Sequence, residues 1–155
     1  MQERTVTHST FVIERSYPCA PERVFAALSD PAKKRRWYTG GRSMELQEFE
    51  MDFRPWGRDR ALYLLREGRP GFTGLYESVY LDIVPDRRIV VAYTMTLGGQ
   101  RISASLATFE LAAGEGGTEL VFTEQSAFFE GADGPERREE GWRNLLQRLA
   151  DDLAA

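Results

Sequence analysis

Glu124 is the titratable side chain whose place in the sequence most clearly suggests chemistry. It lies in the segment TELVFTEQ, residues 118–125, where it alternates with Leu120 and Phe122. Alternate side chains of a regular strand share one face, so this pattern directs the Glu124 carboxylate into the interior. A buried carboxylate without a partner is costly and tends to take up a proton. Three arrangements stay open: an ion pair with Arg15 of the first strand, a bulge that turns Glu124 to solvent, or contact with a ligand.

The chain is also rich in aromatic side chains, with nine Phe, six Tyr and three Trp. Many of them alternate along predicted strands or lie on one face of the predicted last helix, and most of these are expected to form the core. A ligand pocket needs, in addition, a few directional polar groups in an apolar wall. The residues that could supply such a wall and its polar groups are Tyr76, Tyr80, Tyr93, Ser105, Phe109, Phe122, Glu124 and Trp142.

Other residue types argue against the commonest catalytic and metal sites. His8 is the single histidine and Cys19 the single cysteine, so neither a Ser–His–Asp triad nor a multi-histidine metal centre is expected. No nucleotide-binding glycine motif occurs, and GEGG at residues 114–117 is interpreted as a hairpin turn. The sequence therefore predicts no catalytic residue, no metal ligand and no cofactor, and it favours a protein that is not an enzyme.

The segment DPAKKRRWYTG, residues 30–40, combines four consecutive positive charges with two aromatic residues. The net charge of the chain is −4, whereas nucleic-acid binders usually carry a basic surface. We therefore interpret the run as one face of a short helix, with Lys33, Lys34 and Arg36 towards solvent and Ala32 and Trp37 turned inward. Binding to nucleic acid is not expected.

The elements that must position these side chains follow one another in a simple order. A half-buried strand at residues 8–17 precedes two short helices at residues 21–30 and 31–38. Six strands follow, separated by turns rich in Gly, Pro and Asp; they are residues 43–49, 60–67, 72–84, 88–97, 101–111 and 118–125. The last helix, from about Pro135 to Leu153, carries an apolar stripe at Trp142, Leu145, Leu146, Leu149 and Leu153. Closely spaced strands without intervening helices predict an antiparallel meander, which can curl around this last helix.

Length and composition predict a single domain over residues 1–155 with an ordinary soluble composition. The N-terminal ten residues lack the apolar stretch of a signal peptide, and no run is long enough to cross a membrane. We therefore expect a cytoplasmic protein without a membrane partner, and a homodimer stays open.

The order of the elements, with SYPCAPERVFAALSDPAKKRRWYTG near the start and GWRNLLQRLADDL near the end, resembles the START-like (SRPBCC) helix-grip superfamily. Within it the chain is similar to bacterial proteins related to the C-terminal domain of the activator of Hsp90 ATPase. The resemblance implies an α+β fold, in which a curved seven-stranded antiparallel sheet grips the C-terminal helix and two short helices follow the first strand. It also implies that Trp37 and Tyr38 border the mouth of a cavity, with Phe53 and Trp56 on a facing loop. The alternative for Trp37 is that it only fastens its helix to the sheet.

Three functions are consistent with these observations. The first is binding of a small apolar or aromatic molecule in a cavity between the sheet and the last helix, lined by Trp37, Tyr93, Phe109, Phe122 and Trp142. The second is a polyketide cyclase or aromatase-like enzyme, and the third is protein binding like that of an Hsp90 co-chaperone. The absence of a base with a clear partner argues against the enzyme, so the sequence favours ligand binding. An interior without a cavity would instead favour protein binding.

Overall fold

The computed structural model describes residues 5–38, 44–65, 72–131 and 134–155. Its elements occur in the predicted order. Strand β1 (Val6–Tyr17) is followed by helices α1 (Pro21–Ser29) and α2 (Pro31–Trp37). The remaining elements are β2 (Met44–Met51), β3 (Arg58–Leu65), β4 (Thr73–Val84), β5 (Arg88–Leu97), β6 (Gln100–Gly114), β7 (Gly117–Phe129) and α3 (Pro135–Ala154).

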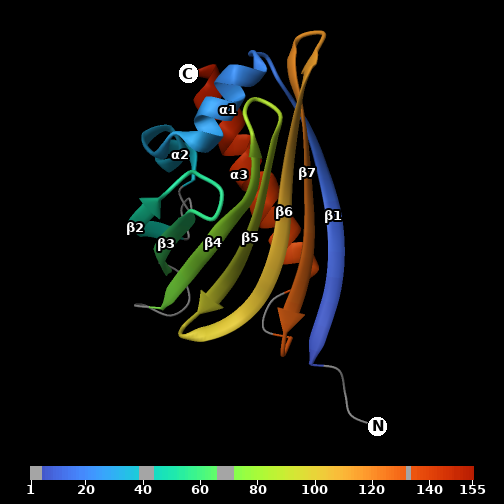
Figure 1. Cartoon of the computed structure of the whole chain (residues 1–155). Coiled ribbons are helices and arrows are strands. Elements are labelled where there is room, and N and C mark those ends of the chain that lie inside the picture. The colour runs from blue at the N-terminus through green and yellow to red at the C-terminus, as the bar shows by residue number, and fades with distance from the viewer. Residues whose placement is uncertain (1–4, 39–43, 66–71, 132–133) are drawn as a thin grey trace.

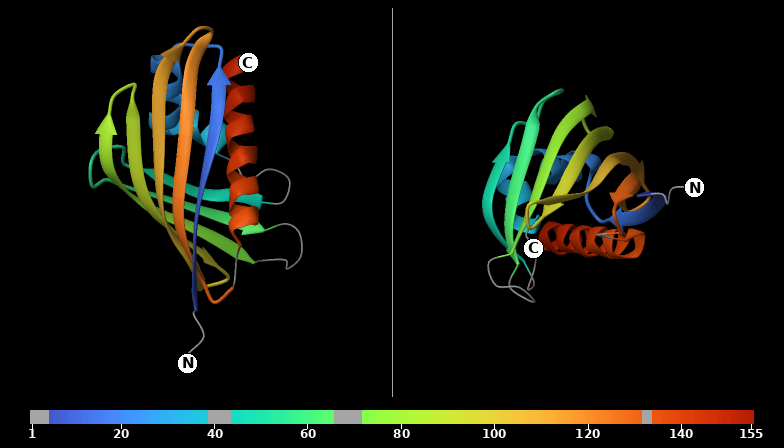
Figure 2. Two further views of the ribbon diagram at one scale, coloured as in Figure 1. Left: turned by 90° about the vertical axis from the view of Figure 1, so that its right-hand side faces the viewer. Right: turned by 90° about the horizontal axis from the view of Figure 1, so that it is seen from below.

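All seven strands form one antiparallel sheet in the order β1-β7-β6-β5-β4-β3-β2. The strands from β2 to β7 form a meander, and β1 adds an edge strand to it, because β1 pairs with β7 along its whole length. Figure 1 shows the curvature of the sheet, with α1 and α2 at one end. Seen from below in Figure 2, the sheet bends around α3. The predicted helix-grip fold is confirmed.

Local sequence accounts for the helix positions. Proline occupies the first turn of each helix, where its missing N–H costs no hydrogen bond. Asp30 ends α1 and caps α2, because its side chain accepts a hydrogen bond of 3.0 Å from the Lys33 backbone N–H. Helix α3 buries the stripe that the sequence predicts, apart from Leu145, which is half-buried. The stripe also extends one turn further, to Arg138, so a charged side chain enters the interior.

No helix in the described part of the chain is both long and apolar enough to span a membrane.

Candidate functional site

A row of polar residues crosses the inner face of the sheet, the face that α3 covers. The register aligns Asp59 of β3 with Ser78 of β4, Ser78 with Tyr93 of β5, Tyr93 with Ser105 of β6, and Ser105 with Ser126 of β7. Directly opposed residues of antiparallel strands project from the same face. These five residues, all buried, are called the polar row below. Two clusters of hydrogen bonds form at its two ends.

The first cluster surrounds Glu124, which has no exposed surface. The Tyr93 hydroxyl donates to Oε1 of Glu124, and the Ser126 hydroxyl donates to Oε2 at 3.1 Å. The Tyr93 oxygen in turn accepts hydrogen bonds of 3.1 Å from Arg138 Nη1 and from the Trp142 indole N–H. Burial, with the negative charge of Glu124, raises the pKa of Tyr93, so the hydroxyl stays protonated and acts as the donor.

This arrangement corrects two of the three alternatives for Glu124. Arg15 lies opposite Leu120 and not opposite Glu124, and its guanidinium donates to the Glu14 carbonyl at 3.3 Å. A bulge is also absent, because the described pairing of β7 with both neighbours runs without a register shift. The carboxylate therefore points inward as alternation predicts, and its partners come from β5, β7 and α3.

Burial raises the pKa of the Glu124 carboxyl, although the Tyr93 hydrogen bond and the charge of Arg138 oppose the shift. A pKa that is higher in the folded than in the unfolded state means that the folded protein binds the proton more tightly. The stability that this proton confers is complete below the unfolded value of about 4.5 and is lost as the pH rises through the folded value.

We therefore predict that Glu124→Gln changes the pH dependence of stability. Urea unfolding between about pH 4 and pH 7.5 should show the wild type losing stability relative to the variant as the pH rises, by at most about 1.4 kcal/mol per pH unit. Glu110→Gln, at an exposed position of β6, serves as the control and should leave the profile unchanged. A constant difference between wild type and Glu124→Gln across this range would contradict the raised pKa.

The second cluster joins α2 to the other end of the polar row. Lys34 Nζ lies 3.0 Å from Asp59 Oδ2, and the Tyr80 hydroxyl donates to the same oxygen. The Lys34 ammonium also lies 4.9 Å from the centre of the Tyr38 ring, a cation–π distance. Lys34 and Asp59 are only 8% and 2% exposed. The prediction that Lys34 faces solvent is therefore wrong, and so is the inward placement of Ala32, which is exposed.

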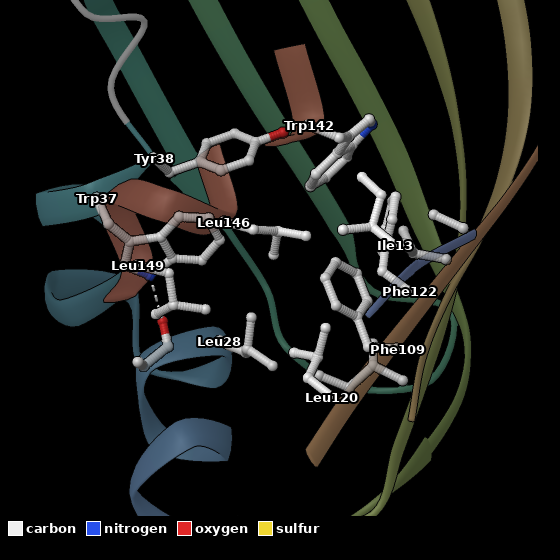
Figure 3. Packing of buried hydrophobic residues seen from close by; sticks show 14 of the residues in the cluster. Ile13, Leu28, Trp37, Tyr38, Phe109, Leu120, Phe122, Trp142, Leu146 and Leu149 are labelled. Atoms are coloured by element: carbon white, nitrogen blue, oxygen red, sulfur yellow. Dashed lines mark hydrogen bonds between the residues drawn. The ribbon is translucent and has the colours of Figure 1, made fainter. Parts of the chain in front are cut away.

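A small cavity lies between the two clusters, under α3. Its volume is about 10 Å³, which is at the lower limit for a single water molecule. Figure 3 labels five of the residues that line it: Leu28, Trp37, Tyr38, Phe109 and Trp142. The full lining is Leu28, Lys34, Trp37, Tyr38, Tyr76, Tyr80, Ile89, Val91, Phe109 and Trp142. As described, this cavity is far smaller than the ligand-sized space that the sequence predicts.

Of the predicted site residues, Trp37, Tyr38, Tyr76, Tyr80, Phe109 and Trp142 line the cavity. Tyr93, Ser105, Phe122 and Glu124 lie in or beside the first cluster. Phe53 packs edge-on against Tyr80, with ring centres 4.9 Å apart. Trp56 does not take part, because its side chain is 73% exposed. The Trp37 indole also donates to the Ala27 carbonyl at 2.8 Å, so this residue fastens α2 to α1 as well as lining the cavity.

Sequence reasoning missed four polar residues of the two clusters: Lys34, Asp59, Ser126 and Arg138. For three of them, the spacing to neighbouring inward residues in the sequence indicates that the side chain faces the interior. Asp59 is in phase with Ala61 and Tyr63, Ser126 is in phase with Glu124, and Arg138 lies four residues before Trp142. Lys34 lies three residues before Trp37, but Lys33 lies four residues before it, so this spacing does not identify which of the two lysines turns inward.

A wider concavity lies on the opposite, outer face of the sheet and shares no residue with the inner cavity. Its volume is about 330 Å³. Ser78, Tyr93 and Ser105 of the polar row border it too. The remaining lining residues are Arg58, Glu77, Val79, Ala92, Thr94, Arg101 and Ala104. It forms a separate surface that any binding experiment must distinguish from the interior.

Most of the chain matches one known protein family. Residues 18–154 match the family described as activator of Hsp90 ATPase homolog 1-like protein. The chain belongs to this family. The match begins just after β1 and ends with α3, so both polar clusters of this AHSA1-like protein lie within the family domain. The START-like relationship inferred from the sequence is confirmed.

Solved structures share the fold of this chain. A protein from Rhizobium leguminosarum is 38% identical over 99% of each chain, with a TM-score of 0.91. A protein from Rhizobium loti is 46% identical over 96% of this chain and 99% of its own, with a TM-score of 0.85. The AHSA1-like protein from Aeromonas hydrophila, 17% identical over 94% and 92% of the two chains with a TM-score of 0.66, shares the fold. The comparison of this AHSA1-like chain with curated proteins gave no match.

Proposed function

We propose that the protein binds a small aromatic molecule between the inner face of the sheet and α3. The observation that carries this proposal is the pair of buried polar clusters on either side of a cavity walled by aromatic rings. Ligand sites are typically apolar walls with a few convergent polar groups, many of them with shifted pKa values. This interior combines those features.

The size of the cavity bears directly on this proposal. At about 10 Å³ it is far below the roughly 300 Å³ of usual ligand pockets, and a filled interior by itself would favour protein binding. A core that served packing alone, however, would gain stability from apolar residues at Asp59, Lys34, Glu124 and Arg138. Retaining charges in the interior is costly, and binding a ligand gives a reason for that cost.

Opening the interior requires a side chain that can leave the cavity wall. Tyr38 is placed for this role, because it follows the last residue of α2 and meets the cavity with its ring. Its ring contacts Tyr76 and Trp37 edge-on, with ring centres 5.7 and 5.5 Å apart. In the proposed bound state the ligand ring takes the place of Tyr38 against Tyr76.

The three tryptophans provide a direct test by NMR. Trp37 and Trp142 line the inner cavity, whereas Trp56 is exposed at the β2–β3 turn and lines neither concavity. Titration with 2-naphthol, at concentrations up to the millimolar range, should shift the indole N–H signals of Trp37 and Trp142. The signal of Trp56 should stay in place.

Other outcomes separate the alternatives. Shifts confined to backbone amides of β4 to β6, such as Ala92 and Thr94, with both inner indoles unchanged, would place the probe in the outer concavity and defeat the proposal. No shift at all would also defeat it, and protein binding would then become the preferred function.

A further inference from the structure

The two ends of the polar row differ in how many of their polar atoms have a hydrogen-bond partner. At the Glu124 end both carboxylate oxygens accept hydrogen bonds, and the Tyr93 hydroxyl donates one and accepts two. The Ser105 and Ser126 hydroxyls lie 2.7 Å apart and bond to each other. The polar groups at this end therefore have partners within the protein.

At the opposite end, two buried oxygen atoms make no hydrogen bond of ordinary length and angle within the described part of the chain: Asp59 Oδ1 and Ser78 Oγ. The Tyr76 hydroxyl lies near enough to Ser78 to interact with it, but without that geometry. Asp59 is 2% exposed and Ser78 is 7% exposed. The two residues are directly opposed on β3 and β4, so both side chains project from the same point of the inner face. Buried oxygens without a partner are rare and costly, and they mark the place where a further polar group completes the network.

This place adjoins the inner cavity. Along β4, Ser78 is flanked on its own face by Tyr76 and Tyr80, and both of these rings line the cavity. The partner of Asp59, Lys34, lines it too. Ser78 and Asp59 do not line the cavity themselves, but Ser78 is the small residue between two tyrosines that do. A polar group on a ligand ring that points from the cavity towards the sheet is therefore directed at this pair.

The chemistry of the two oxygens selects the group. A carboxylate only accepts hydrogen bonds, whereas a serine hydroxyl can accept or donate. The charge of Asp59 is already balanced by Lys34 at 3.0 Å. A cationic ligand group would therefore be repelled by the lysine, and an anionic group would be repelled by the carboxylate. A neutral O–H or N–H group fits both constraints.

We propose that the aromatic ligand presents a neutral hydroxyl or N–H donor to Asp59 Oδ1 and Ser78 Oγ, at the α2 end of the polar row and not at Glu124. The inference rests on the proposed function and names the ligand class, a phenol-like or indole-like molecule. It also assigns the recognition of the ligand to a pair of residues outside the Glu124 cluster.

A matched pair of probes tests this assignment. 2-Naphthol carries a hydroxyl donor, whereas 2-methoxynaphthalene has the same rings and an oxygen that only accepts. We expect the wild type to bind 2-naphthol at least about tenfold more tightly, the ratio that corresponds to about 1.4 kcal/mol. The Trp37 and Trp142 indole signals report both affinities.

Two serine variants locate the donor site. Ser78→Ala removes a hydroxyl that makes no hydrogen bond of ordinary geometry, so the variant should fold normally, and the preference for 2-naphthol should shrink severalfold. Ser105→Ala, on the same inner face but in the Glu124 cluster, should keep the full preference. In the double variant Lys34→Met/Asp59→Asn no buried charge is left, the Tyr80 hydroxyl occupies the asparagine oxygen, and an NH2 donor takes the place of Oδ1. Ser78 is then the only acceptor left of the pair, so the preference should shrink at least as much as in Ser78→Ala.

The results separate this inference from the proposed function. Equal affinities for the two probes in the wild type would overturn the donor assignment while leaving interior binding intact. Loss of the preference in Ser105→Ala but not in Ser78→Ala would move the donor to the Glu124 end and overturn it as well. If neither probe shifts the inner indoles, the proposed function fails together with this inference.

Discussion

Replacing Leu146 with aspartate is expected to prevent the protein from folding. Leu146 has no exposed surface and lies at the centre of the α3 stripe, between Trp142 and Leu149. Its backbone carbonyl also accepts the Tyr17 hydroxyl at 3.2 Å, which ties α3 to β1. The buried side chains on either side of it along α3, Trp142 and Leu149, cannot neutralise a carboxylate. Burying an unpaired charge costs several kcal/mol, a large part of the total stability of a domain of this size.

The matched control is Gln147→Asp, which places the same charge one residue further along α3 on its exposed side. This variant should stay soluble and lose only about 0.5 kcal/mol, the usual range for a surface change. Circular dichroism and thermal unfolding of the two variants give the comparison. A soluble Leu146→Asp protein with an unchanged melting temperature would mean that α3 does not pack against the sheet through this stripe.

The sequence predicts the order and type of the elements because the local patterns are strong. Strands β4 to β7 alternate along most of their length, and α3 keeps its apolar stripe from Trp142 to Leu153, so each pattern repeats often enough to identify one face. The ends of the elements depend on hydrogen bonds outside the pattern. Strand β3 begins at Arg58, two residues earlier than predicted, and this shift moves Asp59 from a turn into the sheet.

The Lys34–Asp59 contact could not be predicted in the same way. Helix α2 has seven residues, and its four consecutive cations offer no contrast between a polar and an apolar face. The helical phase is set by Trp37, one turn later, and by an acidic partner that lies 25 residues away on another element. Glu124 was predictable because its neighbours at i−2 and i−4 are apolar, but its partners depend on the register of three strands and on α3.

The size of the cavity also cannot be predicted from local sequence patterns. The rings of Tyr38, Tyr76 and Trp142 come from the end of α2, from β4 and from α3, and the space between them depends on how the side-chain volumes of all three elements add up. Strand alternation and helical periodicity indicate which residues face the interior, and six of the predicted site residues do line the cavity. They do not give the volume that these residues leave, because interiors pack to nearly uniform density whatever the pattern.

The buried pair between Lys34 and Asp59 gives the second large prediction. Lys34→Met removes the ammonium and leaves the Asp59 carboxylate, whose side chain is 1% exposed, with the Tyr80 hydroxyl as its remaining partner in the cluster. We expect a loss of about 3–5 kcal/mol in the free energy of unfolding, the usual cost of breaking a buried ion pair from one side. Lys33→Met, at the neighbouring exposed position, should stay within about 0.5 kcal/mol of the wild type.

The double variant Lys34→Met/Asp59→Asn distinguishes the cost of an unpaired charge from the value of the pair itself. The asparagine that replaces Asp59 retains a carbonyl oxygen that accepts from Tyr80, and the methionine that replaces Lys34 fills the space of the lysine stem without a charge. Most of the lost stability should therefore return, because neutral replacement of a buried pair is often harmless or stabilising. Urea unfolding of the wild type, both single variants and the double variant completes the cycle. A double variant as unstable as Lys34→Met would mean that the lysine acts through its packing between Tyr38 and Tyr80 and not through its charge. In that case the ion pair does not hold α2 against the sheet.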